Sequence, residues 1–382
     1  VMLYFDNAAT SFPKPAEVKS AVSDALAYYG ANPGRSGHKM AMETSARVFD
    51  CRERIAELFG CPEPENVVFT KNCTESLNIA IRSAALGGHC IISDLEHNSV
   101  LRPLYDMQAC GEGNFSVAEV DLNDEDKTLA NFKRALRPDT KLIAVTGASN
   151  VIGTKLPTER LAALAHENGA LFLLDAAQTA GTEKYDMAAQ NIDFLCAPGH
   201  KGLLGPMGTG ILAASRPEIL RPMLFGGTGS FSLDFTQPED MPERLESGTL
   251  NVPGICGLLA GAKKVAKEGE KNIARREMQL AKMIYAEISG IKGAKLFAPL
   301  PEEQTSAPVI SFVLGDLTGE MTAALLSEKG VAVRGGFHCS ALAHRKLGTQ
   351  NRGTCRISVG YMNTFDEAVK LCRIIHSAAK DA

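Results

Sequence analysis

Short apolar runs alternate with helical stretches from about residue 14 to residue 255, and this alternation constrains the fold more than any other feature of the sequence. Parallel strands need a long crossover, usually a helix, so the pattern is typical of β-α units that stack into a mostly parallel sheet. The runs are apolar throughout, as strands covered on both faces must be. They lie at residues 67–69, 90–92, 142–145, 171–174 and 194–196. We therefore predict an α/β domain with a mostly parallel central sheet.

Polar residues follow each of these runs directly. Open α/β sheets bind their ligands at the carboxyl ends of the strands. The polar segments are residues 70–75, 94–97, 147–150, 175–178 and 198–201. We expect all five to face one crevice.

A smaller domain is predicted after a loop at residues 226–251, which is rich in Gly, Pro and acidic residues. A long helical pattern over residues 255–289 has the spacing of an exposed amphipathic helix, and short strands and helices follow it. We predict a large α/β domain at residues 14–255. Residues 1–13 and 256–382 would form the smaller α+β domain.

Charge and cysteine usage exclude several functional classes. The 382 residues carry a formal net charge of −4, so no basic field holds a nucleic-acid backbone. No apolar run approaches the roughly 18 residues of a membrane span, and no secretion signal opens the sequence, so we expect a cytoplasmic protein. The ten Cys residues include no Cys-x-x-Cys pair and are expected to be reduced thiols.

Common motif searches return little. Neither dinucleotide nor P-loop glycine patterns occur, the segment 205–210 fits neither, and no G-x-S-x-G elbow is present. The adjacent His338 and Cys339 cannot easily both bind one metal, so no metal site is expected.

Lys201 and Asp175 are candidates for cofactor chemistry. Lys201 follows an apolar run within a glycine-rich segment, and Asp175 ends another run. A carboxylate there would keep a pyridinium nitrogen protonated. The structural alternatives are a solvated loop lysine and an Asp that caps the next helix.

Two other segments after strands have similar alternatives. Residues 70–76 could bind a phosphate at the positive end of a helix or simply cap that helix. His97 could stack on an aromatic ring and move protons, or only make local hydrogen bonds.

Cys339 and Arg356 are candidates in the smaller domain. Cys339 follows a glycine-bearing segment with cationic neighbours, which favours a thiolate, although most cysteines only pack. Arg356 could bind a carboxylate bidentately, or form a surface salt bridge.

Taken together, these residues resemble the pyridoxal-phosphate (PLP)-dependent cysteine desulfurases and selenocysteine lyases of the class V aminotransferase fold. The resemblance extends from end to end of the chain. Its motifs lie at residues 4–10, 74–78, 96–100, 149–151, 175–178, 199–201, 246–249 and 338–339. The resemblance implies a fold type I PLP-dependent transferase.

The resemblance also implies roles for individual residues. Lys201 would bind the cofactor covalently, Asp175 would pair with its pyridine nitrogen, Gln178 would touch its ring hydroxyl and His97 would lie over the ring and assist proton transfer. The cofactor phosphate would be contacted by Cys73, Thr74 and His200, and by Thr228 from the neighbouring subunit of a homodimer. The substrate carboxylate would be contacted by Asn150, Arg334 and Arg356.

The implied activity converts L-cysteine to L-alanine and leaves the sulfur as a persulfide on Cys339. The compact cysteine loop resembles that of desulfurases assisted by a sulfur-acceptor protein, in iron-sulfur cluster or thio-cofactor assembly. Pro198 stands where many relatives have a phosphate-binding serine, so Cys73 or Thr74 must compensate, and residues 343–353 also depart from the pattern. The alternatives are a selenocysteine lyase, another aminotransferase-like enzyme, and a non-catalytic protein that kept the fold.

Overall fold

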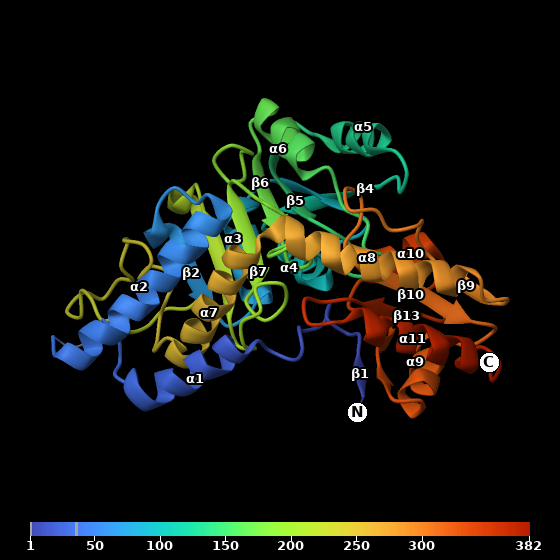
Figure 1. The fold of residues 1–382 in the computed structure, drawn as a ribbon. Helices are drawn as coiled ribbons and strands as arrows, with labels where there is room; N and C mark the ends of the chain where they lie inside the picture. Colours follow the sequence, from blue (N-terminus) through green and yellow to red (C-terminus); the bar gives the residue numbers. More distant parts are fainter. Residues whose placement is uncertain (1, 35–36) are drawn as a thin grey trace.

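The chain folds into a larger unit around a seven-stranded sheet and a smaller unit around a four-stranded sheet (Figure 1). The computed structural model describes residues 2–34 and 37–382, so residue 1 of the predicted small domain and residues 35 and 36 of the large one lie outside the described residues. The strand order of the large sheet is β2-β8-β7-β6-β5-β3-β4, and only β8 runs antiparallel to its neighbours. The prediction of a mostly parallel sheet is confirmed.

The large sheet is built from seven short strands. They are β2 (Val67–Thr70), β3 (His89–Ser93), β4 (Asn114–Ala118), β5 (Thr140–Thr146), β6 (Leu171–Asp175), β7 (Phe194–Pro198) and β8 (Gly210–Ala214). Two of these, β4 and β8, were missed from sequence. β4 is a half-exposed strand at the sheet edge and lacks the apolar run of a covered strand.

Helices cover both faces of this sheet. They are α1 (Ala16–Tyr28), α2 (Lys39–Phe59), α3 (Cys73–Ala84), α4 (Asn98–Ala109), α5 (Glu125–Ala135), α6 (Thr158–Glu167) and α7 (Val252–Glu268), and two short 3₁₀ turns lie at Pro64–Asn66 and Pro217–Ile219. Alternate residues of β5 belong to two different apolar clusters: Ile143 to one that includes residues of α2, α6 and α7, and Leu142 to one that includes residues of α3 and α4. The inner strands are mostly apolar because both faces of the sheet are buried there.

The smaller unit contains the four-stranded antiparallel sheet β12-β13-β10-β9. Its elements are α8 (Glu270–Ser289), β9 (Ala294–Leu296), β10 (Val309–Leu314), α9 (Gly319–Glu328), β11 (Val331–Ala332), β12 (Arg334–Gly336), α10 (Ala341–Leu347), β13 (Thr354–Ser358) and α11 (Phe365–Ala378). The N-terminal strand β1 (Leu3–Tyr4) pairs with β11, so the N-terminal segment belongs to the smaller unit.

The helical pattern over residues 255–289 forms two helices rather than one. Gly269 separates α7 from α8 with a φ of 80°, a conformation that favours glycine. The expectation of an exposed helix is wrong for α7, because α7 is largely buried against α1 and α2. Helix α8 instead packs with α11 and extends along the smaller unit (Figure 1).

Candidate active site

Five strand ends meet at one cavity on the carboxyl edge of the large sheet, as the sequence predicts. The cavity has a volume of about 120 Å³. Of the predicted site residues, Cys73, Thr74, His97, Asn150, Asp175, Gln178, His200 and Lys201 line it. They come from the segments after β2, β3, β5, β6 and β7, which are far apart in sequence.

Lys201 lies in the turn after β7 and is half-buried rather than fully solvated. A Cβ at the next residue, Gly202, would lie 2.1 Å from the carbonyl oxygen of Ala180, so close packing holds the backbone in place beside the lysine. Burial lowers the pKa of the Lys201 ammonium, and the charge of Arg356 lowers it further against the opposing effect of Asp175. The amine is therefore more readily neutral and nucleophilic than a surface lysine.

Asp175 is the buried last residue of β6. Its Oδ1 accepts hydrogen bonds from the backbone N–H of Ala177 at 2.9 Å and from the thiol of Cys73 at 3.7 Å. Burial raises the pKa of Asp175, whereas the nearby Lys201 lowers it. Asp175 therefore accepts a hydrogen bond from its own turn and also lines the cavity. A cationic partner in the cavity would keep its carboxyl group ionised.

His97 is the N-cap of α4, and its Nδ1 accepts a hydrogen bond from the N–H of Ser99 at 3.1 Å. Nε2 then carries the proton of the neutral ring. Burial and the charge of Lys201 lower the pKa of His97 to about 4. Ser99, which sequence reasoning missed, also bonds Thr74 through their hydroxyls at 2.8 Å.

The N-terminus of α3 offers an anion site. The side chain of Asn72 accepts a hydrogen bond from the backbone N–H of Glu75. The N–H groups of Cys73 and Thr74 have no partner within the helix and remain available to bind an anion. Nδ1 of His200 is buried and has no hydrogen-bond partner within residues 2–34 and 37–382. Burial lowers the pKa of His200 to about 4, so this nitrogen belongs to a neutral ring.

Arg356 lies on β13 of the smaller unit and bonds Asn150, which lines the cavity. Its side chain is 1% exposed, so the alternative of a surface salt bridge is wrong. Its guanidinium donates to the carbonyl of Asn150 and to Asp6, each at 2.9 Å. Its buried Nε has no partner among the residues that the structure describes. Arg334 stands directly opposite Arg356 across the β12–β13 pair. Like charges in that position are destabilising unless an anion lies between them.

Cys339 lies in the four-residue connection between β12 and α10. Both His338 and Cys339 adopt left-handed backbone conformations, with φ of 49° and 56°, which are uncommon for residues other than glycine. The side chain amide of Asn150 donates to the carbonyl of His338 at 2.7 Å and accepts from the hydroxyl of Ser340 at 2.6 Å. Asn150 thus connects the cavity to the cysteine connection, and Cys339 itself is exposed.

Thr228 is the one predicted cofactor residue that this chain does not bring to the cavity. It lines a separate pocket with Arg52 and Glu246, and its hydroxyl contacts Ser230 at 3.4 Å.

The whole chain is similar to known proteins. The family model described as "Aminotransferase class-V" matches residues 3–371. The chain belongs to this family. A probable cysteine desulfurase of Methanothermobacter thermautotrophicus is 32% identical, over 96% of this chain and 92% of the relative. A probable cysteine desulfurase of Vibrio cholerae is 31% identical, over 99% of this chain and 93% of that relative.

Solved structures agree with the fold. The apo cysteine desulfurase of Thermococcus onnurineus NA1 superposes with a TM-score of 0.92 at 30% identity, covering 100% of this chain and 95% of that one. The cysteine desulfurase CsdA of Escherichia coli, in an S-sulfonic acid form, gives a TM-score of 0.88 at 26% identity, covering 99% and 95%. The predicted fold type I architecture is confirmed.

The residues that line the cavity fit PLP, the cofactor of this family. An amine with a lowered pKa, Lys201, and a buried carboxyl, Asp175, share one cavity. The helix N–H groups at Cys73 supply donors for a phosphate, and the unpaired Nδ1 of His200 supplies another in the tautomer that carries its proton there. The chain therefore uses PLP.

Proposed function

We propose that the chain is a PLP-dependent cysteine desulfurase that converts L-cysteine to L-alanine and keeps the sulfur as a persulfide on Cys339. One observation carries the proposal: the exposed Cys339 lines a cavity that shares Thr74, His97 and Ser99 with the cavity of Lys201. A thiol is thus next to the site of amino-acid chemistry. The names of the relatives favour cysteine over selenocysteine lyase activity or another aminotransferase-like activity.

Bound PLP supplies an electron sink for a carbanion at the substrate α-carbon. Lys201 would hold the cofactor and, when released as a neutral amine, remove the α-proton. Asp175 would keep the pyridine nitrogen protonated, and Gln178 would bond the ring hydroxyl. His97 would stack on the ring and assist proton transfer through Nε2. Phosphate contacts are proposed for Cys73, Thr74 and His200.

The substrate carboxylate is proposed to bind at Arg356. Three of its N–H groups remain after the bonds to Asn150 and Asp6, and one of them is the buried, unpartnered Nε–H. A carboxylate would also relieve the repulsion between Arg356 and Arg334. Asn150 would complete this subsite.

Cys339 is proposed as the sulfur acceptor. Its thiolate would attack the sulfur of the substrate, so that the S–S bond forms as the C–S bond breaks. The carbon fragment keeps the electron pair of the broken bond, takes up protons and leaves as alanine. The enzyme retains Cys339 as a persulfide, a reversible modification.

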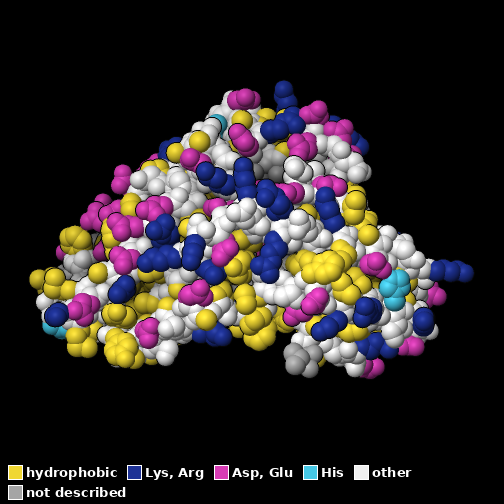
Figure 2. All heavy atoms as spheres, viewed as in Figure 1, with side chains coloured by type: hydrophobic (Ala, Val, Ile, Leu, Met, Phe, Trp, Pro, Cys, Tyr) yellow, Lys and Arg dark blue, Asp and Glu magenta, His cyan; other side chains and the backbone are white. Residues whose placement is uncertain are grey.

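We also propose a homodimer in which Thr228 contacts the cofactor phosphate of the neighbouring subunit. Large exposed apolar side chains support an interface: Leu26, Tyr28, Met40 and Met42 lie on α1 and α2, where Figure 2 shows apolar side chains gathered at the lower left. Phe231, Leu233 and Phe235 follow Thr228 and are exposed too.

The remaining assignments are proposals as well. They are the division into domains 14–255 and 1–13 with 256–382, a cytoplasmic location, and a sulfur-acceptor protein in iron-sulfur cluster assembly. Among the described residues, no helix is long and apolar enough to cross a membrane.

The activity is tested by incubating the PLP-loaded protein with L-cysteine and a reductant and measuring alanine and sulfide together. Equal amounts of both would support the proposal. Binding of PLP without production of either compound would contradict it, and alanine from L-selenocysteine alone would establish the lyase alternative.

A further inference from the structure

A second cavity of about 360 Å³ lies in front of Cys339. His97 forms part of its wall and also lines the cavity of Lys201. Two arginines, Arg82 and Arg102, contribute charge, and no acidic side chain of the described residues lines this cavity. The charged side chains that line the space next to the Cys339 thiol are therefore all cationic.

Arg102 is the cation of this cavity that has no partner among the described residues. Asp106 lies four residues further along α4, where it could pair with Arg102, but it forms an ion pair with Arg82 instead. Arg82 also approaches Glu112 at 3.8 Å. No hydrogen bond or ion pair of Arg102 occurs within residues 2–34 and 37–382, so its guanidinium is free to bind an anion from solution.

Helix α4 places Arg102 beside the thiol. The N–H of Asn98, the first residue of α4, donates to the carbonyl of Cys339 at 2.8 Å. Arg102 is four residues later and shares a helix face with Asn98, and long helical side chains lean toward the N-terminus of their helix. Arg102 also contributes to the lowered pKa of His97, in keeping with its closeness to the site.

We propose that this cavity binds a thiol that carries a carboxylate, with Arg102 as the partner of that carboxylate, and that this thiol takes the sulfur from Cys339. The inference rests on the proposed function. The incoming thiolate attacks the outer sulfur of the Cys339 persulfide, so a new S–S bond forms while the bond to Sγ breaks. The acceptor leaves as a persulfide and Cys339 returns to a thiolate, with no external oxidant or reductant. The arginine offsets the repulsion between two anions as they approach.

The test separates sulfur uptake from sulfur release. PLP-loaded enzyme receives one equivalent of L-cysteine, and the alanine formed is measured in a single turnover. The persulfide is then discharged at equal thiolate concentrations by 3-mercaptopropionate, 2-mercaptoethanol or cysteamine, which carry a negative, neutral or positive group. We expect wild type to react about five- to tenfold faster with 3-mercaptopropionate than with 2-mercaptoethanol at low salt.

Substitutions assign this preference to one residue. Arg102→Gln should lose the preference, and Arg102→Glu should prefer cysteamine, while both form alanine in the first step as wild type does. Arg134→Gln makes the same charge change at an exposed site on α5 and should keep the wild-type pattern. An unchanged preference in both Arg102 variants, or no preference in wild type, would overturn the inference. If wild type forms no alanine, the proposed function itself fails and the inference fails with it.

Discussion

Arg356 and Asp6 form a partly buried ion pair at 2.9 Å that joins β13 to a segment 350 residues earlier in the chain. The proposed substrate-binding arginine is therefore positioned by the N-terminal segment, which β1 attaches to the same unit. Asp6 belongs to one of the family motifs, but the sequence alone assigned no role to it. The pair leaves Arg356 with free donors for a carboxylate.

Arg356→Lys tests this subsite. Lysine cannot bind a carboxylate bidentately, so the KM for L-cysteine should rise about tenfold or more while PLP binding is kept. Steady-state alanine formation would give the KM, and the visible spectrum of the cofactor would report PLP binding. Arg373→Lys on α11 is exposed and serves as the control. An unchanged KM would remove Arg356 from the substrate site.

Lys201→Ala should lose both the visible absorbance of covalently bound PLP and all turnover, because no other amine would replace it in the cavity. Spectroscopy after incubation with PLP and an alanine assay would show this. Lys184→Ala, at an exposed position, should behave as wild type. Full activity of Lys201→Ala would contradict the assignment.

Cys339→Ala should keep the PLP spectrum but lower sulfide release from L-cysteine by about 100-fold or more, since it removes the nucleophile. The control is Cys110→Ala, the other exposed cysteine of the described chain. Sulfide release by Cys339→Ala at the wild-type rate would rule out a persulfide on this residue.

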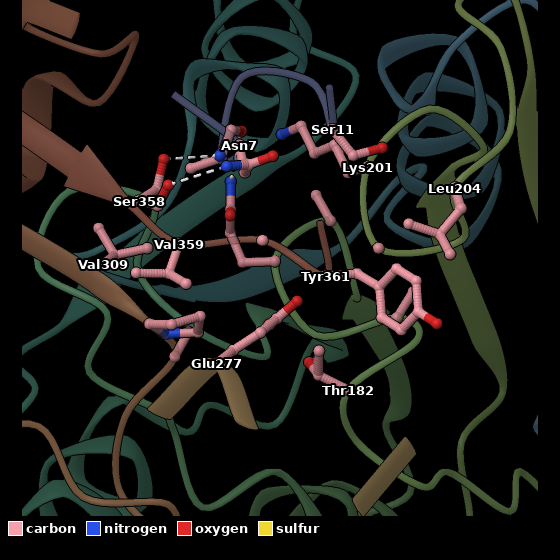
Figure 3. Close-up of a pocket in the computed structure, with 18 residues that line it drawn as sticks. Asn7, Ser11, Thr182, Lys201, Leu204, Glu277, Val309, Ser358, Val359 and Tyr361 are labelled. Carbon is pink, nitrogen blue, oxygen red and sulfur yellow. Dashed lines mark hydrogen bonds between the residues drawn. The ribbon is translucent and has the colours of Figure 1, made fainter. Parts of the chain in front are cut away.

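Glu277→Gln tests a buried carboxyl that points into the pocket between the two units (Figure 3), where Lys201 also lines the wall. Burial raises the pKa of Glu277 from 4.5 to about 8. The folded state then binds more protons than the unfolded state between these values, so the free energy of unfolding should fall as pH rises through this window. Relative to Glu277→Gln, wild type should lose about 1.4 kcal/mol per pH unit at most. Urea denaturation from pH 5 to 8.5 would measure the difference, and parallel curves would contradict the prediction.

His338→Gln should show the opposite pH dependence. Burial, with the charge of Arg356, lowers the pKa of His338 from 6.5 to about 2. The unfolded state binds the proton first, so wild type should lose stability relative to the variant as pH falls below 6.5. Denaturation at pH 7, 6 and 5 would detect this loss, and a constant difference would show that His338 is not held neutral.

The cavity residues that sequence predicted share one physical property: each lies at or shortly after the carboxyl end of a strand of the large sheet. Asp175 and Lys201 could be located because β6 and β7 are short apolar runs. Residues that act through distant partners carried no comparable signal. Ser99 belongs to the site through its hydrogen bond to Thr74. Glu277 belongs to a pocket only because residues of the larger unit form part of the same wall.

The sequence by itself determined the parallel sheet, the edge at which chemistry takes place and the family, because apolar periodicity and short motifs are local properties. Tertiary structure decided which cations are neutralised. Asp106 pairs with Arg82 and leaves Arg102 without a partner in the described part of the chain, and Asp6 pairs with Arg356 without using all of its donors. These outcomes depend on competition for carboxylates between elements far apart in the chain, and only the packed fold brings the competitors within reach of one another.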